Sequence, residues 1–278
     1  MSPQRPDAPQ RRAVKRLAKY WHIFAIQLVN SLAYPAELVG RSLMMIPFMW
    51  IFAQLWQVTF EAAGTDAING LTLPATLWYL MMAETIELSR PRLGNAIADA
   101  VKDGSIAYIL NKPYSFLLYQ LSASLGETIF RAVLNAIFGG AVIWLLAGPP
   151  PHPVLGLLAA IPAIFGAWIL NFCISVIIGL AAFVTEDVSA FLWIYQKFAF
   201  ILGGLLIPLD FYPAWLQTIA KALPFASLIY GPARLFVAPS PTALFNILGM
   251  QLAWIAALGL LAIFAYRRGV AYLTINGG

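Results

Sequence analysis

Long apolar segments alternate with short polar ones along most of this chain. Each apolar segment is close to, or longer than, the ~20 residues that a helix needs to cross the hydrocarbon core of a bilayer. We place six of them at 38–55, 71–88, 116–146, 154–184, 190–209 and 244–266. The second has the shortest apolar core, because Pro74, Glu84 and Glu87 interrupt it. The pattern predicts an all-α polytopic membrane protein with one domain, 1–278, and six transmembrane helices.

The composition excludes several other classes of protein. Hydrophobic residues make up 61% of the chain and charged residues only 10%, with a mean hydropathy of +0.78, which is too apolar for a water-soluble globule. Cys173 has no second cysteine to pair with, and His22 and His152 are too few for a usual zinc site. The sequence contains no Walker-type phosphate loop and no hydrolase or zinc-protease motif. We therefore expect no enzyme activity, metal or cofactor in this chain.

The basic residues predict how the chain is oriented. Most of the 17 Lys and Arg residues lie before the first span, between the second and third spans, or after the last. With six spans, these three regions share one side of the membrane, and the positive-inside rule makes that side the cytoplasm. Both termini are therefore predicted to be cytoplasmic.

Residues 11–24 predict an amphipathic helix in the membrane interface. Apolar residues recur at helical spacing opposite a basic face. The apolar positions are Val14, Leu17, Trp21 and Phe24, and the basic ones are Arg12, Lys15, Arg16 and Lys19. The basic face would meet anionic lipid head groups. This arrangement fits neither a signal peptide nor a nucleic-acid-binding arm, and the alternative is a tail that only sets the topology.

A polar island at 90–113 separates the second and third spans. After Pro91, residues 95–103 predict a short cytoplasmic helix that Gly104 ends. Its apolar side carries Ile97 and Val101, and its other sides carry polar residues. The polar residues are Asn95, Asp99, Lys102 and Asp103. The apolar side either docks on the chain's own membrane domain or enters a groove of a cytoplasmic partner, and the residues alone leave both alternatives open.

A polar stripe runs along the third span. Its members recur every three or four residues and so share one helical face. They are Gln120, Ser124, Glu127, Arg131 and Asn135. Because ionisable groups are costly in hydrocarbon, this face is expected to look into the protein, a cavity or a subunit interface. It lines a pathway, or it holds a structural Glu127–Arg131 pair.

Prolines divide the segment that follows the fifth span. They include Pro208, Pro213 and Pro224, and the stretch 214–230 also carries Trp215. The piece between Pro213 and Pro224 is too short to cross a bilayer but apolar enough to enter one. We predict a re-entrant helical hairpin that forms an outer gate. The alternative is a loop that lies flat on the outer head groups.

The order of these features resembles a known family. A basic amphipathic helix and two spans precede the motif Asp103-Gly-Ser-Ile-Ala-Tyr-Ile-Leu-Asn-Lys-Pro113. The motif Leu205-Leu-Ile-Pro-Leu-Asp-Phe-Tyr-Pro-Ala-Trp-Leu216 then comes ahead of Leu223-Pro-Phe225 and the last span. Over nearly its whole length the chain is similar to permease subunits of ATP-binding-cassette (ABC) transporters of the type 2 export class, within a bacterial group of largely unassigned substrate.

The resemblance implies a role for each segment. Residues 11–24 would be the interfacial helix, 95–103 the coupling helix, and 214–230 the outer re-entrant segment. The partners would be the lipid bilayer, two nucleotide-binding subunits that carry ATP and Mg²⁺, and a second permease, either a copy of this chain or a related one. The location would be the bacterial cytoplasmic membrane, and no nucleic acid is expected as a partner.

Two other classes remain open on the residues alone. A channel or ion-coupled carrier would use Glu127, Arg131 and Lys197 without ATP, although the cores of the fourth and sixth predicted spans contain no acidic or basic residue. A membrane-embedded enzyme would need clustered carboxylates or a nucleophile beside a base, and the sequence suggests neither. The sequence does not indicate the substrate.

Overall fold

The structure is a computed structural model that describes residues 8–33, 35–110, 112, 114–185 and 187–276. Within these ranges, side chains are described from residue 18 to residue 271, apart from 35–37 and 110. The basic side chains before residue 18 therefore lie outside the described residues, as do Asn111 and Pro113 of the polar island.

The chain is helical apart from one small hairpin. Helices α1 (Ala8–Leu32), α2 (Pro35–Leu43) and α3 (Met45–Ala63) lead to the antiparallel strands β1 (Ala67–Ile68) and β2 (Leu71–Thr72). Next come α4 (Leu73–Ser89), α5 (Leu93–Lys102), α6 (Ser105–Leu110), α7 (Phe116–Ala147), α8 (Pro153–Leu180) and η1 (Ala181–Phe183). The last elements are α9 (Ser189–Leu202), η2 (Leu209–Phe211), α10 (Ala214–Ala222), α11 (Pro224–Leu228), α12 (Tyr230–Val237) and α13 (Pro241–Asn276).

Four helical segments in the described part of the chain are long and apolar enough to cross a membrane. They are Leu38–Ala63, Phe116–Ala147, Pro153–Phe183 and Pro241–Ala271, which match the first, third, fourth and sixth predicted spans. The second and fifth predicted spans contain shorter helices, because α4 has 17 residues and α9 has 14. The chain is thus an all-α, multi-pass membrane protein.

Local sequence explains where the two shorter helices stop. The helix α4 begins after Thr72, whose hydroxyl accepts a hydrogen bond from the Ala75 N–H at 3.4 Å. It ends before Arg90, which is extended because a proline follows it. The predicted end of the fifth span at 209 is wrong: α9 stops at Leu202, and the chain turns through Gly204, which has a φ of +71°.

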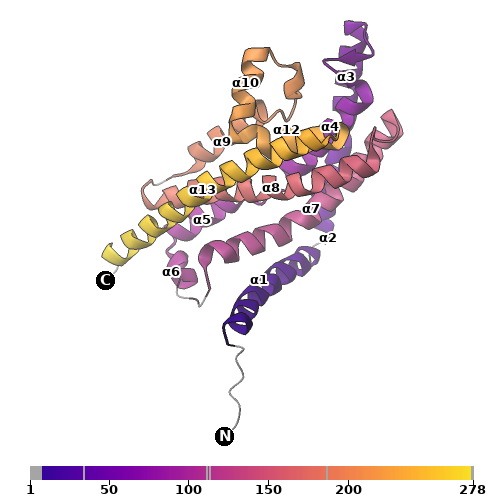
Figure 1. Cartoon of the computed structure of the whole chain (residues 1–278). Coiled ribbons are helices and arrows are strands. Elements are labelled where there is room, and N and C mark those ends of the chain that lie inside the picture. The colour runs from indigo at the N-terminus through magenta and orange to yellow at the C-terminus, as the bar shows by residue number, and fades with distance from the viewer. Residues whose placement is uncertain (1–7, 34, 111, 113, 186, 277–278) are drawn as a thin grey trace.

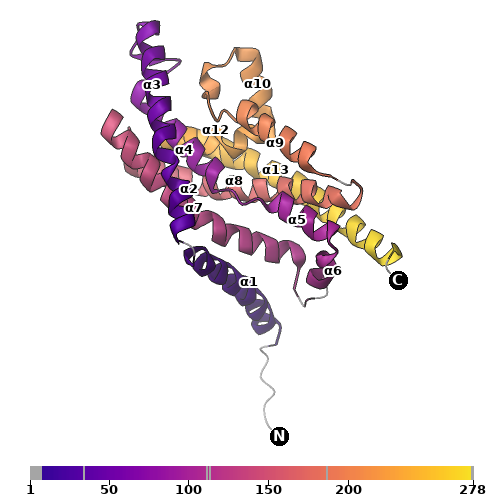
Figure 2. The ribbon, with the colours of Figure 1, turned by 180° about the vertical axis from the view of Figure 1, so that it is seen from behind.

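The helices α4 and α8 form the core. Nearly every side chain of α4 from Ala75 to Ile86 is buried, because α3, α7 and α12 pack around it. The helix α8 packs along α13 and also contacts α5 and α12. Figures 1 and 2 show α5, α6 and the C-terminal part of α13 at one end of the molecule, which we call the α5 end. The tip of α3, the hairpin and α10 lie at the opposite, α10 end.

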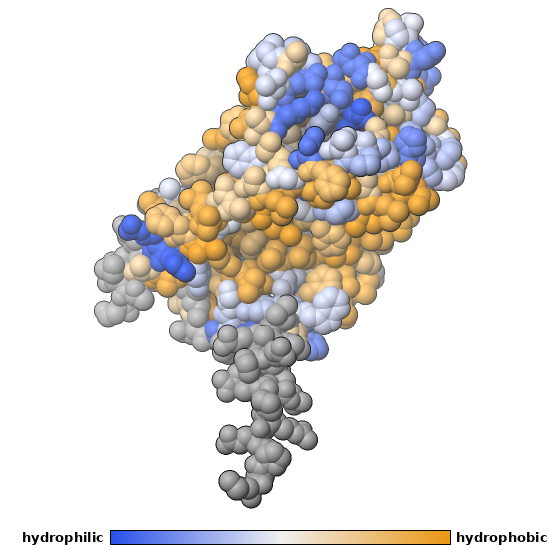
Figure 3. All heavy atoms as spheres, viewed as in Figure 1, coloured by the Kyte–Doolittle hydropathy of each residue, from blue (hydrophilic) through white to orange (hydrophobic). Residues whose placement is uncertain are grey.

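The surface matches this division into two ends. Figure 3 shows a broad apolar band across the middle of the molecule, with more polar atoms above it at the α10 end. Large apolar side chains such as Leu145 and Leu260 are exposed, at 85% and 70%. Apolar surface of this extent is expected where lipid, rather than water, surrounds a protein.

The N-terminal helix is longer than the predicted 11–24 and has a protein partner. It continues to Leu32 and packs along α7, with its backbone at Phe24 close against Gly126. The Tyr20 hydroxyl accepts a hydrogen bond from the Ser115 N–H at 3.0 Å. Trp21 is 65% exposed on the other side. One side of α1 is therefore held by α7, and Trp21 marks a side left open to the surroundings.

Candidate functional site

A large hollow opens among α2, α3, α4, α5, α7, α8, α9 and the α4–α5 connection, with a volume of about 1180 Å³. Part of its wall is apolar and includes Leu38, Met44, Phe48, Leu192, Trp193 and Leu206. Charged side chains also line it, among them Arg41, Glu84, Glu87, Arg92, Glu127 and Arg131. It has the size of a small-molecule site and combines apolar surface with a few polar groups, as such sites do.

Arg90 contacts three helices of this wall, α4, α8 and α9. Its guanidinium forms an ion pair with Glu87 and donates hydrogen bonds to Asn171 Oδ1 at 3.1 Å and to Tyr195 Oη at 2.8 Å. The Tyr195 hydroxyl in turn donates to Asn171 Oδ1 at 2.7 Å. We call Glu87, Arg90, Asn171 and Tyr195 the elbow cluster. It joins the start of the α4–α5 connection to α8 and α9.

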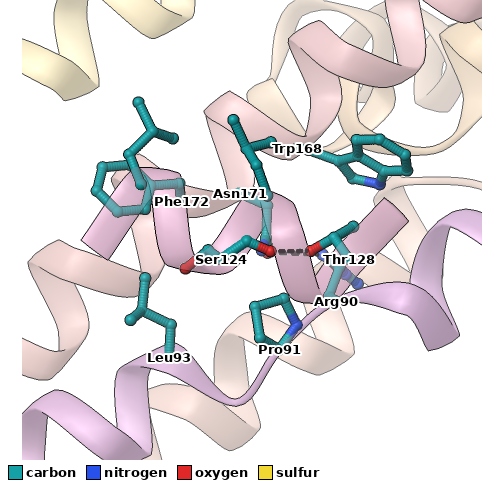
Figure 4. A pocket seen from close by; sticks show the side chains of 10 residues that line it. Arg90, Pro91, Leu93, Ser124, Thr128, Trp168, Asn171 and Phe172 are labelled. Atoms are coloured by element: carbon teal, nitrogen blue, oxygen red, sulfur yellow. Dashed lines mark hydrogen bonds between the residues drawn. The ribbon is translucent and has the colours of Figure 1, made fainter. Parts of the chain in front are cut away.

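A small pocket lies beside the elbow cluster. Figure 4 shows Arg90, Pro91 and Leu93 together with side chains of α7 and α8 around it. Its volume is about 10 Å³, which is room for about one water molecule. Arg90 and Asn171 line both this pocket and the hollow. Pro91 and Leu93 also line both, so these four residues form the wall between the pocket and the hollow.

The structure divides the predicted polar stripe of α7. Glu127, Arg131 and Asn135 line the hollow, Ser124 lines the small pocket, and Gln120 lines neither. Glu127 and Arg131 form an ion pair within the chain. The sequence left open whether this pair is structural or faces a cavity. In the structure it is both, since the paired side chains form part of the hollow's wall.

The helix α5 turns its apolar side inward. Ile97 is 1% exposed and packs on α8 at Gly179, where an added Cβ would lie 2.8 Å from the Ile97 Cβ. Val101 is half-buried beside it, whereas the predicted polar residues remain exposed. These are Asn95, Asp99, Lys102 and Asp103. Of the two alternatives for the apolar side, the structure has it docked on the chain's own membrane domain, so only the polar side is left for a partner.

Short hydrogen bonds order the two loops next to this polar side. The Ser105 N–H donates to Asp103 Oδ1 at 2.8 Å, and hydrogen bonds from Ser105 hold the Asp103 pKa below its ordinary value. Asp187 likewise accepts bonds from the N–H and hydroxyl of Ser189, which lower its pKa. Lys102 Nζ lies 3.7 Å from Asp187 Oδ1. The exposed side of α5 and the start of α9 therefore form one charged surface.

A second polar cluster holds the α10 end. The Asp210 carboxylate lies 3.2 Å from Arg234 Nε and accepts a hydrogen bond from the Tyr230 hydroxyl at 3.0 Å. The Asp210 carbonyl accepts hydrogen bonds from Asn69 Nδ2 at 2.8 Å and Gln217 Nε2 at 3.3 Å. We call these five residues the lid cluster. It joins the β-hairpin, η2, α10 and α12.

The predicted gate residues occupy different environments around the lid cluster. Pro208 and Pro224 are buried, while Pro213 and Trp215 are exposed. Pro213 and Pro224 lie at the starts of α10 and α11, as their fixed φ and missing N–H favour. The predicted stretch 214–230 is thus a chain of short helices, and the structure continues it to Val237 in α12.

Sequence reasoning missed the side chains that organise both ends. Glu84 and Glu87 were seen only as interruptions of a span, and Asn171, Tyr195, Asp210 and Arg234 were not assigned a role. One signal was available: Glu87 and Arg90 are three residues apart, the spacing at which helical side chains meet. The partners on α8, α9 and α12 are distant in sequence, and no local spacing indicates them.

No curated protein is significantly similar to the chain. Residues 41–277 match the protein family described as "ABC-2 family transporter protein". The match covers most of the chain, including the hollow, α5 and both polar clusters, and the apolar helices agree with a transporter membrane domain. The chain therefore belongs to the ABC-2 family of transporter proteins, as a membrane permease component.

Proposed function

We propose that this chain forms half of an export pathway and that separate ATP-binding subunits drive it through α5. The pathway would run through the hollow and a second permease, either a copy of this chain or a related one. The six spans would be α2 with α3, α4, α7, α8, α9 and α13. Two partner subunits would carry ATP and Mg²⁺.

The observation that carries this proposal is the elbow cluster. The helix α5 docks its apolar side on α8 and leaves its polar side free, and Arg90 lies just before it. Through its hydrogen bonds to Asn171 and Tyr195, Arg90 joins this segment to two helices that line the hollow. A push on the exposed side of α5 would therefore reach the hollow through direct contacts, rather than through a flexible loop.

The charges support the orientation. Arg92 and Lys102 lie on or next to α5, and Arg267 and Arg268 lie near the end of α13 at the same end of the molecule. By the positive-inside rule, the α5 end would face the cytoplasm. The α10 end, with the lid cluster and the short helices, would face outward and close the pathway on that side.

The proposal is tested by reversing the exposed side of α5. The variant Asp99→Arg reverses the charge of an exposed side chain of α5 that does not line the hollow, so the chain is expected to insert normally. Co-purification with the ATP-binding subunit should be lost or strongly reduced. The matched control is Glu61→Arg, which makes the same change on the exposed end of α3.

The two variants separate a coupling surface from a general effect of added charge. The control should co-purify like the unchanged chain, because it lies at the opposite end of the molecule. Equal co-purification of both variants with the ATP-binding subunit would remove α5 as the docking helix. Purification without any ATP-binding subunit from the native membrane would remove the ABC permease function itself.

A further inference from the structure

Four polar side chains in the wall of the hollow lack partners. Ser42, Glu84, Asn135 and Ser175 are only 4–6% exposed. None of them has a side-chain hydrogen bond or ion pair with any residue that the structure describes. They come from α2, α4, α7 and α8, and all four line the hollow. Buried polar groups in proteins are nearly always hydrogen-bonded to protein or to water, so the partner of these four, water or a ligand, has to come from the hollow.

Glu84 is the ionisable group of this site. Arg90 acts electrostatically on Glu84, but the Arg90 guanidinium forms its ion pair with Glu87. Glu127 is likewise paired with Arg131. Removing one partner from a nearly buried charge pair is costly, so Arg90 is not free to neutralise Glu84, and Arg131 is occupied by Glu127. Glu84 is therefore the carboxylate of the hollow that has no ion-pair partner among the described residues.

The remaining cations of the hollow lie in a different environment. Arg41 and Arg92 line it, but both residues are exposed, where water and salt weaken their effect on a buried carboxylate. The wall also includes the apolar side chains of Met44, Phe48 and Leu206. The hollow thus combines buried acceptor groups with apolar surface.

We propose that Glu84, Asn135, Ser42 and Ser175 bind the ammonium group of an amphiphilic amine, with its apolar body against the wall of the hollow. An alkylammonium group has N–H donors and no acceptor, and carboxylate, amide and hydroxyl oxygens all accept. With the ammonium bound, the Glu84 carboxylate is its counter-ion, and an alcohol or a sulfate of the same chain length could not form this ion pair. The proposal names the substrate class of the proposed pathway and rests on the hollow's being that pathway.

The binding test needs no ATP-binding subunit. Gln196 and Leu206 are exposed residues in the wall of the hollow, and each is replaced singly by cysteine in membrane vesicles. The rate of labelling by a small methanethiosulfonate reagent is measured with dodecylamine, dodecanol or dodecyl sulfate present. The native Cys173 is buried, and the chain without an added cysteine gives the background.

Dodecylamine should slow the labelling at lower concentrations than either of the other two compounds. In Glu84→Gln, the dodecylamine concentration for half-protection should rise about tenfold or more, because a hydrogen bond to a charged group is lost. Glu84→Asp keeps the charge and should keep most of the protection. Glu61→Gln, the same change on the exposed end of α3, should leave the protection as in the unchanged chain.

Three results would overturn the proposal: equal protection by all three compounds, unchanged protection in Glu84→Gln, or no labelling at either reporter. If Glu84→Gln does not accumulate in the membrane, Asn135→Asp decides instead. By adding a second carboxylate it should lower the half-protective concentration, and no decrease would count against the site. Loss of the ATP-binding partner would leave all these results unchanged, so failure of the proposed function and failure of this site are distinguishable.

Discussion

The two ends of the molecule are held by polar clusters that differ in burial and in reach. In the elbow cluster, the Arg90 and Glu87 side chains are 8% and 13% exposed, and side chains join three separate parts of the chain. In the lid cluster, Arg234 and Asp210 are 25% and 15% exposed. Two of the contacts there go to the Asp210 carbonyl rather than to its carboxylate.

This difference suggests different tasks for the two clusters. Breaking a buried ion pair costs much free energy. The elbow cluster therefore suits a connection that keeps its contacts while the helices around it move. A more exposed cluster with neutral contacts is easier to separate and reform. We therefore expect the elbow cluster to transmit motion and the lid cluster to open and close.

The largest effect is expected at the elbow cluster. Arg90→Met leaves Glu87 buried without its ion-pair partner and removes two hydrogen bonds. We expect a loss of about 3–5 kcal/mol in the free energy of unfolding, measured by denaturation in mixed micelles. A loss below about 1 kcal/mol would contradict the importance of the buried pair.

A double variant separates stability from transmission. Glu87→Met, Arg90→Met removes both charges, so most of the lost stability should return. The hydrogen bonds to Asn171 and Tyr195 remain absent, so coupling between ATP hydrolysis and the hollow should stay impaired. Recovery of coupling together with stability would show that the elbow cluster only supports the fold.

A smaller effect is expected at the lid cluster. Asp210→Asn keeps an oxygen that can accept from Tyr230 but removes the charge that faces Arg234. We expect a loss of about 1–2 kcal/mol in unfolding free energy, because the pair is partly exposed. Labelling of a cysteine in the hollow from the α10 side should become faster. Unchanged labelling from that side would contradict a closing role for the cluster.

The smallest effect concerns the loop between α5 and α6, and it depends on pH. Because Ser105 lowers the Asp103 pKa in the folded chain, the ionised carboxylate stabilises this loop. The contribution is fully present above the unfolded pKa of about 4 and is lost as the pH falls through the lower folded pKa.

Hydrogen exchange of the α6 amides measures this contribution. At neutral pH, Asp103→Asn should exchange faster than the unchanged chain, and the difference should shrink on acidification. Asp99→Asn is the matched control, since the Asp99 side chain accepts no hydrogen bond from the described residues. A difference that does not depend on pH would exclude the carboxylate as the cause.

Sequence patterns predicted the elements that depend on local order. The apolar runs indicated the long helices, and Pro91 and Gly104 bracketed the short helix that the structure has at Leu93–Lys102. The polar stripe of α7 was also detectable, because its members share one turn spacing. The proline-rich stretch after α9 was expected to contain short helices for the same reason.

The parts that sequence reasoning missed depend on contacts across the fold. The burial of Ile97 depends on Gly179, and Arg90 finds its partners at Asn171 and Tyr195. The hollow exists only because residues of α2, α3, α4, α5, α7, α8 and α9 and of the α4–α5 connection meet around it. Glu84 likewise has no ion-pair partner among the described residues because Arg90 pairs with Glu87. No spacing along the chain reveals this.

The central claim is that nucleotide on a partner subunit changes the hollow through α5 and the elbow cluster. It is tested most directly by the labelling rate of Gln196→Cys from the α5 side, in the complete complex, without nucleotide and after trapping with ATP and vanadate. We predict that trapping slows the labelling strongly and that Glu87→Met, Arg90→Met removes this difference. Equal rates with and without trapped nucleotide in the unchanged elbow cluster would contradict the claim.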